Sequence, residues 1–203
     1  VKIDTVDVSA DITYSVLPSN QKEDGTISFN NLNGKLLNVY TQDSLSNNPM
    51  VLDASGLLMD QGPFDARVMF NMKDTMNTFD FSGKVYQFPL SCMNRILTPV
   101  ADVKVTGGLN EKASFSFRGN KNYALGSMTF HYNGLKIQFL NPDTHTLQGF
   151  FPSFKTFFAN TFVIKKNNPR FLFARDSRIF HQRDDSRAIF NLWGKALLSG
   201  VVS

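Results

Sequence analysis

Apolar and polar residues alternate along most of this chain of 203 residues. In residues 64–72 the apolar positions are Phe64, Ala66, Val68, Phe70 and Met72, and most positions between them are polar. The same two-residue period recurs in 79–85, 113–118, 128–132 and 135–139. Because successive side chains of a strand point to opposite faces, this period predicts strands with one apolar and one polar face. Such one-sided strands are typical of antiparallel sheets.

Glycine and asparagine residues interrupt the alternation where turns are expected. Turn signals separate the apolar runs at Gly25, Asn33-Gly34, Gly62-Pro63, Gly107-Gly108 and Asn133-Gly134. Asn133-Gly134 lies between two alternating segments, which is the strongest short-range signal for a hairpin. The chain therefore reads as a meander of strands, and its first residues, VKIDTVDVSADITY, already read as one of them.

Three segments replace the strand period with helical spacing, and helices are predicted near 90–97, 150–160 and 187–199. Ser91 is the expected N-cap of the first helix, and Pro99 its expected end. The second lies in FFPSFKTFFANTF (150–162), whose phenylalanines fall within an arc of roughly 140°. The third places Ile189, Trp193 and Leu197 on one face. After the second helix, TFVIKK and RIFHQR read as a final pair of strands.

These elements predict a mostly-β fold, in which a curved antiparallel sheet forms a groove or half-barrel with two or three short amphipathic helices. The chain is 42% hydrophobic and 19% charged, which is a globular composition. No low-complexity linker divides it, so residues 1–203 are expected to form a single β-rich domain. Since the chain begins in mid-pattern, we expect it to come from a longer protein.

Charge is distributed unevenly between the two halves. Residues 1–103 carry seven Lys or Arg and twelve Asp or Glu, whereas residues 104–203 carry fourteen and five. A basic half can face anionic lipid headgroups or nucleic acid, or it can be an ordinary solvated surface. Basic and aromatic residues mix in 165–187, but strand alternation accounts for the aromatics there. We expect no nucleic-acid partner, and a membrane surface or an envelope protein remains a possible one.

The sequence lacks a recognisable catalytic constellation. Cys92 is the single cysteine, and the three histidines, His131, His145 and His181, lie in polar contexts. Asp184-Asp185 is an adjacent carboxylate pair, and helix capping accounts for it. No nucleophile elbow, P-loop, zinc or EF-hand spacing occurs. We therefore expect no enzyme activity, no catalytic residues, no cofactor and no metal.

The apolar faces themselves are the remaining candidate site. If they form one continuous concavity, it can hold the acyl chains of a phospholipid or another lipid. Alternatively, the protein's own side chains fill it, and the domain is a structural scaffold. The candidate lipid-contact residues are Phe64, Val68, Phe70, Phe79, Phe81, Phe115, Phe117, Phe130, Ile137, Phe139, Phe154 and Phe158.

Several segments resemble the C-terminal region of the AsmA-like proteins of bacterial envelopes. They are GSMTFHYNGLKIQFL (126–140), FFANTFVIKKNNPR (157–170) and RDDSRAIFNLWGKALLSGVVS (183–203). Upstream, LDASGLLMDQGPFDARVMFNM (52–72) and FDFSGKVYQFPLSCMNRILTP (79–99) are similar to the family's preceding strand pairs and short helix. The resemblance spans residues 25–203 and has a Bacteroidota-type character.

This resemblance implies a long protein of the Gram-negative periplasm, anchored to the inner membrane by a helix outside this chain. The wider superfamily, which includes TamB-like and bridge-like lipid-transfer proteins, curls elongated sheets around a hydrophobic groove. The resemblance therefore implies a role in lipid transport or outer-membrane homeostasis and biogenesis. It supplies no catalytic residues.

Overall fold

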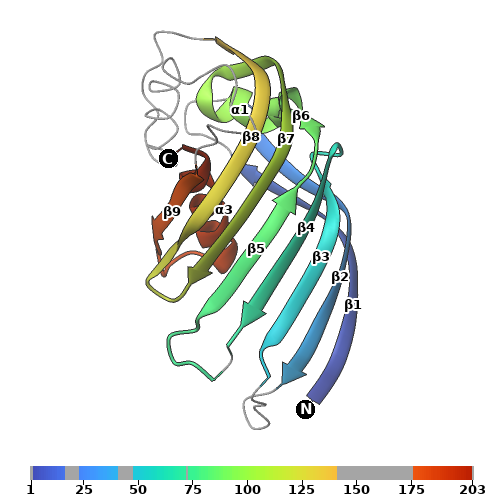
Figure 1. Ribbon diagram of the computed structural model, residues 1–203, viewed down its shortest axis with the longest axis vertical. Helices are drawn as coiled ribbons and strands as arrows, with labels where there is room; N and C mark the ends of the chain where they lie inside the picture. The colour runs from blue at the N-terminus through green and yellow to red at the C-terminus, as the bar shows by residue number, and fades with distance from the viewer. Residues whose placement is uncertain (1, 17–22, 41–47, 72, 141–175, 203) are drawn as a thin grey trace.

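The computed structural model describes residues 2–16, 23–40, 48–71, 73–140 and 176–202 (Figure 1). These residues form one open antiparallel sheet of nine strands, in the order β1-β2-β3-β4-β5-β7-β8-β9, with β6 paired to β7. The sheet is not closed into a barrel, and the prediction of a mostly-β, curved antiparallel fold is confirmed. The strands are β1 (Lys2–Val16), β2 (Gly25–Tyr40), β3 (Met50–Leu58), β4 (Gly62–Phe70), β5 (Phe79–Val85), β6 (Phe88–Pro89), β7 (Val103–Gly119), β8 (Tyr123–Phe139) and β9 (Asp176–Gln182).

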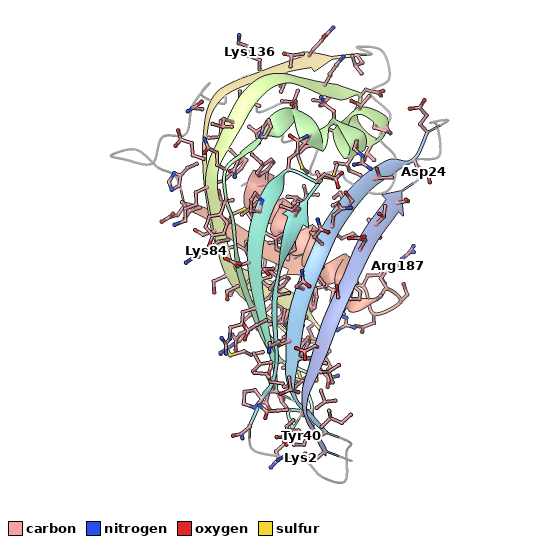
Figure 2. The ribbon with its side chains drawn as sticks, turned by 90° about the vertical axis from the view of Figure 1, so that its right-hand side faces the viewer. Lys2, Asp24, Tyr40, Lys84, Lys136 and Arg187 are labelled. Atoms are coloured by element: carbon pink, nitrogen blue, oxygen red, sulfur yellow. The ribbon has the colours of Figure 1, made fainter. Side chains whose placement is uncertain are left out.

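The register places apolar side chains on one face of the sheet and polar side chains on the other. Cross-strand pairing lines up Leu52, Val68, Phe81 and Phe117 in one row. We call this apolar side, which carries the helices, the concave face (Figure 2). The neighbouring row on the opposite, outer face is polar, and it begins with Asp7, Lys35, Asp53 and Arg67. Lys84 shows the direction of this outer face in Figure 2.

A short helical unit occupies the upper end of the concave face. The 3-10 helix η2 (Leu90–Met93) continues into α1 (Asn94–Ala101), which packs Ile96 and Val100 against β2. The approach is so close that a Cβ on Gly25 would lie 2.5 Å from Val100 Cγ2. Asn94 ties the helix to β7, because its amide group exchanges two hydrogen bonds with the backbone of Val105. The unit therefore spans the concavity between β2 and β7 (Figure 1).

The C-terminal helix, α3 (Ile189–Val202), packs on the concave face at β8 and β9. Leu192 and Ala196 are buried in the core cluster there, together with Ile179 of β9 and Met128 of β8. Gly200 allows this contact, since a Cβ at this position would lie 2.8 Å from Ile179 Cγ1. The prediction of a helix near 187–199 is thus confirmed, with Ile189, Trp193 and Leu197 facing the sheet.

Two predicted turns are bends within long strands instead. Asn133-Gly134 lies inside β8 and Gly107-Gly108 inside β7, where the register between the two strands shifts. Gly134 has φ 62° and Gly108 has φ 122°, so the left-handed conformation that these dipeptides favour is present, but in a paired bulge. The prediction of a hairpin at Asn133-Gly134 was therefore wrong. The bulges bend β7 and β8 over η2 and α1 (Figure 2).

Other local predictions also need correction. Asn33-Gly34 lies within β2, next to a register shift at Asn31, rather than in a turn. Pro99 lies inside α1, which ends two residues later with Asp102 in the left-handed conformation. Ser91 does not cap the helical unit, which begins after Pro89 without a side-chain cap.

The predicted helix at 150–160 and the strand TFVIKK lie outside the described residues, and β9 pairs with β8. In the part of the chain that the structure describes, no helix has the length and apolar character to cross a membrane.

Candidate functional site: the concave apolar face

The part of the concave face beneath α3 is filled by the protein itself. Val68, Phe79 and Phe117 are each no more than 2% exposed. The Trp193 ring of α3 packs on them, with its centroid 4.8 Å from that of Phe81 and 5.9 Å from that of Phe79. A ligand can reach these rings only if α3 moves away. We call this region the α3 core.

A second buried cluster lies under the helical unit η2–α1. It consists of Phe88, Leu90, Val105 and Tyr132, with Phe130 and Ile137 packed at its margin. The centroids of Phe130 and Tyr132 are 5.1 Å apart. Because this cluster is separate from the α3 core, the predicted lipid-contact residues do not form one continuous exposed surface.

The remaining part of the concave face, on β1 and β2, is apolar and half-exposed. We call it the open face, and it consists of Val6, Val8, Ala10, Ile12, Tyr14, Leu32 and Leu36. Ile12 is 46% exposed and Tyr14 is 44% exposed. None of the seven belongs to the clusters that the described helices bury. The open face thus continues the apolar rows of the sheet outside the clusters that the described helices cover.

Polar groups stand at the lower end of the open face. Lys2 and Tyr40 pair across β1 and β2 there (Figure 2). Lys2 Nζ lies 2.9 Å from Asp4 Oδ1, and the hydrogen bond to this carboxylate raises the pKa of Lys2. The Tyr40 hydroxyl donates to Asn38 Oδ1 at 3.3 Å. An apolar strip that ends in hydrogen-bonding groups suits an amphiphile, which has an apolar chain and a polar head.

A different hollow of about 880 Å³ runs across β1 to β7. Its walls include outward-pointing side chains such as Asp53, Arg67 and Lys84, and the backbone between the polar rows forms its floor. Arg67 Nη1 lies 3.3 Å from Asp53 Oδ1, so part of this charge is already paired. We do not assign the lipid site to this hollow, because its walls would leave acyl chains among charges.

The structure divides the predicted lipid-contact residues into three groups. Val68, Phe79, Phe81 and Phe117 are buried in the α3 core, and Phe70 and Phe115 pack at its edge. Phe64 is partly buried with its ring 5.6 Å from that of Phe29, while Phe130 and Ile137 line the cluster under η2–α1. The side chains of Phe139, Phe154 and Phe158 lie outside what the structure describes.

Sequence reasoning missed the open face. The signal was present, because Val6, Val8, Ala10, Ile12 and Tyr14 alternate with polar residues along β1. The alternation alone does not say which strands a helix covers, and the richer phenylalanine content of β4 to β8 directed the prediction to strands that the described helices largely cover.

Among the described residues, no group of three or more His, Cys, Asp or Glu side chains is placed to hold a metal ion. Burial raises the pKa of the Cys92 thiol to about 11, so the thiol stays protonated near neutral pH. Burial, with a contribution from Lys195, lowers the pKa of His181. His131 lies on β8 with no hydrogen-bond partner for its buried Nδ1, and His145 falls outside the described residues.

No protein-family model, curated protein or solved structure matches this chain. The AsmA-like resemblance therefore stays a prediction, and the functional assignment depends on the geometry of the concave face.

Proposed function

We propose that this chain is a non-catalytic lipid-binding or lipid-transfer domain that holds acyl chains on the open face. The observation that supports this proposal is the half-exposed apolar row on β1 and β2, next to a fully packed α3 core. Burying a Val, Leu or Ile side chain completely contributes roughly 1.5–3 kcal/mol. Covering the exposed half of such a set would thus contribute on the order of several kcal/mol, which is enough to hold an acyl chain.

The cellular setting is part of the same proposal. Through its resemblance to AsmA-like proteins, the domain would act in the periplasm of a Gram-negative bacterium. An inner-membrane helix outside this chain would anchor it, and it would serve phospholipid transport or outer-membrane homeostasis. A membrane surface or an envelope protein would be its partner, because lipid has to enter and leave the open face.

The test compares two neighbouring positions on β1 that point to opposite faces. Val8→Asp places a charge on the open face, whereas Ser9→Asp places the same charge on the outer face. Protein purified without detergent is examined by native mass spectrometry for bound phospholipid. We expect lipid adducts on the wild type and on Ser9→Asp, and their loss from Val8→Asp with an unchanged circular dichroism spectrum. Equal adducts on both variants would contradict the assignment of the site.

An aspartate at Val68 or Phe117 would not test the lipid site in this way. Both residues are 2% exposed beneath α3. An unpaired carboxylate there would unfold the α3 core rather than block a ligand, since burying such a charge is strongly destabilising.

The α3 core supports a second candidate function, a structural scaffold of the cell envelope. There the protein's own rings already fill the concavity, as a scaffold requires. This alternative predicts that the wild type carries no lipid and excludes fluorescent fatty-acid probes. Probe binding that competes with phospholipid would rule it out.

A further inference from the structure

The two edges of the sheet are protected to very different extents. At one edge, β9 has only seven residues, and its Phe180 N–H donates to Ser199 Oγ of α3 at 3.1 Å. At the other edge, β1 has 15 residues, and among the described residues it pairs only with β2. Figure 1 shows β1 at the outer margin of the sheet, with no labelled element beyond it.

A long unpaired edge exposes a row of backbone N–H and C=O groups that can template another strand. Natural edges are commonly shortened, bulged or given inward-pointing charges to prevent this pairing. β1 has none of these devices between Val6 and Tyr14, where its inward row is apolar throughout. The pairing of β1 with β2 shifts register between Ala10 and Ile12. The extra residue of this bulge lies in β2, where Asn31 has a positive φ, so the bulge does not interrupt β1.

The charged side chains of β1 indicate which charges a strand paired to this edge should carry. Its outward row carries Asp7 and Asp11, four positions apart, and the side chain of Asp7 is 78% exposed. Asp7 Oδ1 lies 3.6 Å from Lys35 Nζ on β2, and Asp11 Oδ1 accepts the Asn31 N–H. Each carboxylate therefore has one partner on the β2 side. Side chains directly across a strand pair interact favourably when their charges are opposite.

We propose that the edge of β1, which is unpaired among the described residues, binds an extended polypeptide strand by β-augmentation. The inward row of that strand is apolar and completes the concave face, and its outward row carries Lys or Arg opposite Asp7 and Asp11. Backbone hydrogen bonds supply the affinity, and the alternating side chains supply the selectivity. This inference concerns the edge of the sheet, so it does not depend on whether the open face binds lipid.

The probe is the synthetic peptide TVKVTVKVT, which has valines on one face and lysines four positions apart on the other. One control peptide carries N-methyl groups on one edge, which removes its strand hydrogen bonds. The other replaces both lysines with glutamate. Binding is measured by fluorescence anisotropy of labelled peptide, and the site is located by amide hydrogen exchange.

We expect the lysine peptide to slow amide exchange in β1, and the N-methylated peptide to bind at least about tenfold more weakly. Asp7→Lys should weaken binding of the lysine peptide and strengthen binding of the glutamate peptide, each by roughly two- to fivefold. The matched control is Ser116→Lys, which adds a lysine to the outer face far from the edge.

Three results would overturn the proposal. Equal binding of the methylated and unmethylated peptides would exclude backbone pairing. Exchange protection confined to residues outside β1 would place the contact elsewhere. A free protein that is already a dimer with protected β1 amides would show that a second copy, rather than a cationic strand, occupies the edge.

Discussion

Replacing Phe79 with alanine should remove the main support of α3 on the sheet. Phe79 is 1% exposed, and its ring centroid lies 6.2 Å from those of Phe70 and Phe117 and 5.9 Å from that of Trp193. A Cβ on Gly119 would collide with the Phe79 ring, so Gly119 is the residue that makes room for it. These neighbouring rings come from two strands, β4 and β7, and from α3, and they can collapse only partly into the space that the substitution leaves.

The expected loss of unfolding free energy follows from the burial of the Phe79 ring and from its aromatic contacts. Phe→Ala substitutions in cores cost about 3–5 kcal/mol, and aromatic pairs add about 0.5–1.5 kcal/mol to area burial. We therefore expect Phe79→Ala to lie in the upper half of this range, about 4–5 kcal/mol. For a chain of this length, that loss corresponds to a decrease in Tm of about 8–20 °C.

Urea unfolding followed by the fluorescence of Trp193 and by far-ultraviolet circular dichroism measures this loss. Trp193 is a selective reporter because it is the single tryptophan of the chain. The control is Phe180→Ala, since Phe180 is 56% exposed on β9 and should cost at most about 0.5 kcal/mol. A loss below about 1 kcal/mol for Phe79→Ala, or an equal loss for Phe180→Ala, would refute the packing of α3 on these rings.

Two further predictions address backbone strain and pH. Gly134 has φ 62°, and no heavy atom lies within 4 Å of the position that a Cβ would take. Gly134→Ala should therefore lower the free energy of unfolding only by the cost of holding alanine in the left-handed conformation, about 1–2 kcal/mol. At Gly108, a Cβ would lie 2.9 Å from Leu135 Cα, so Gly108→Ala should cost more in the same urea titration, and an equal or smaller cost would contradict the paired bulge. The folded-state pKa of His181 is lowered, so its contribution to stability is present above the unfolded pKa of about 6.5 and is lost as pH falls through the folded value. His181→Gln should therefore flatten the dependence of unfolding free energy on pH below about pH 6.5, and an unchanged dependence would count against the cause assigned to this shift.

Strand alternation predicted the faces of the sheet because it depends only on the geometry of extended chain. The inward positions of β4, β5 and β7 follow directly from the sequence. The Asn133-Gly134 signal failed for a different reason. An Asn-Gly pair favours a backbone conformation with positive φ, and Gly134 adopts this conformation in a bulge instead of a hairpin turn. Only the pairing of residues 103–119 with 123–139 over their whole length decides between the two.

The candidate site was harder to predict, because exposure depends on which elements cover a face. Phe79 and Val8 both lie in apolar alternating rows, yet α3 covers the first and no described helix covers the second. Likewise, nothing local in Lys2–Val16 shows that this strand lies at the edge of the sheet. Both properties arise from the order of the strands, which the sequence pattern does not encode.

Site-specific photocrosslinking along β1 tests the central claim most directly. A benzophenone side chain is placed in turn at Val8 and Ile12, which belong to the open face, and at Ser9 and Thr13, which point outward. After irradiation in cells, the purified protein is analysed by mass spectrometry for attached phospholipid. We predict lipid adducts at Val8 and Ile12 and none at Ser9 and Thr13. Adducts at all four positions, or at none of them, would contradict the proposed lipid site.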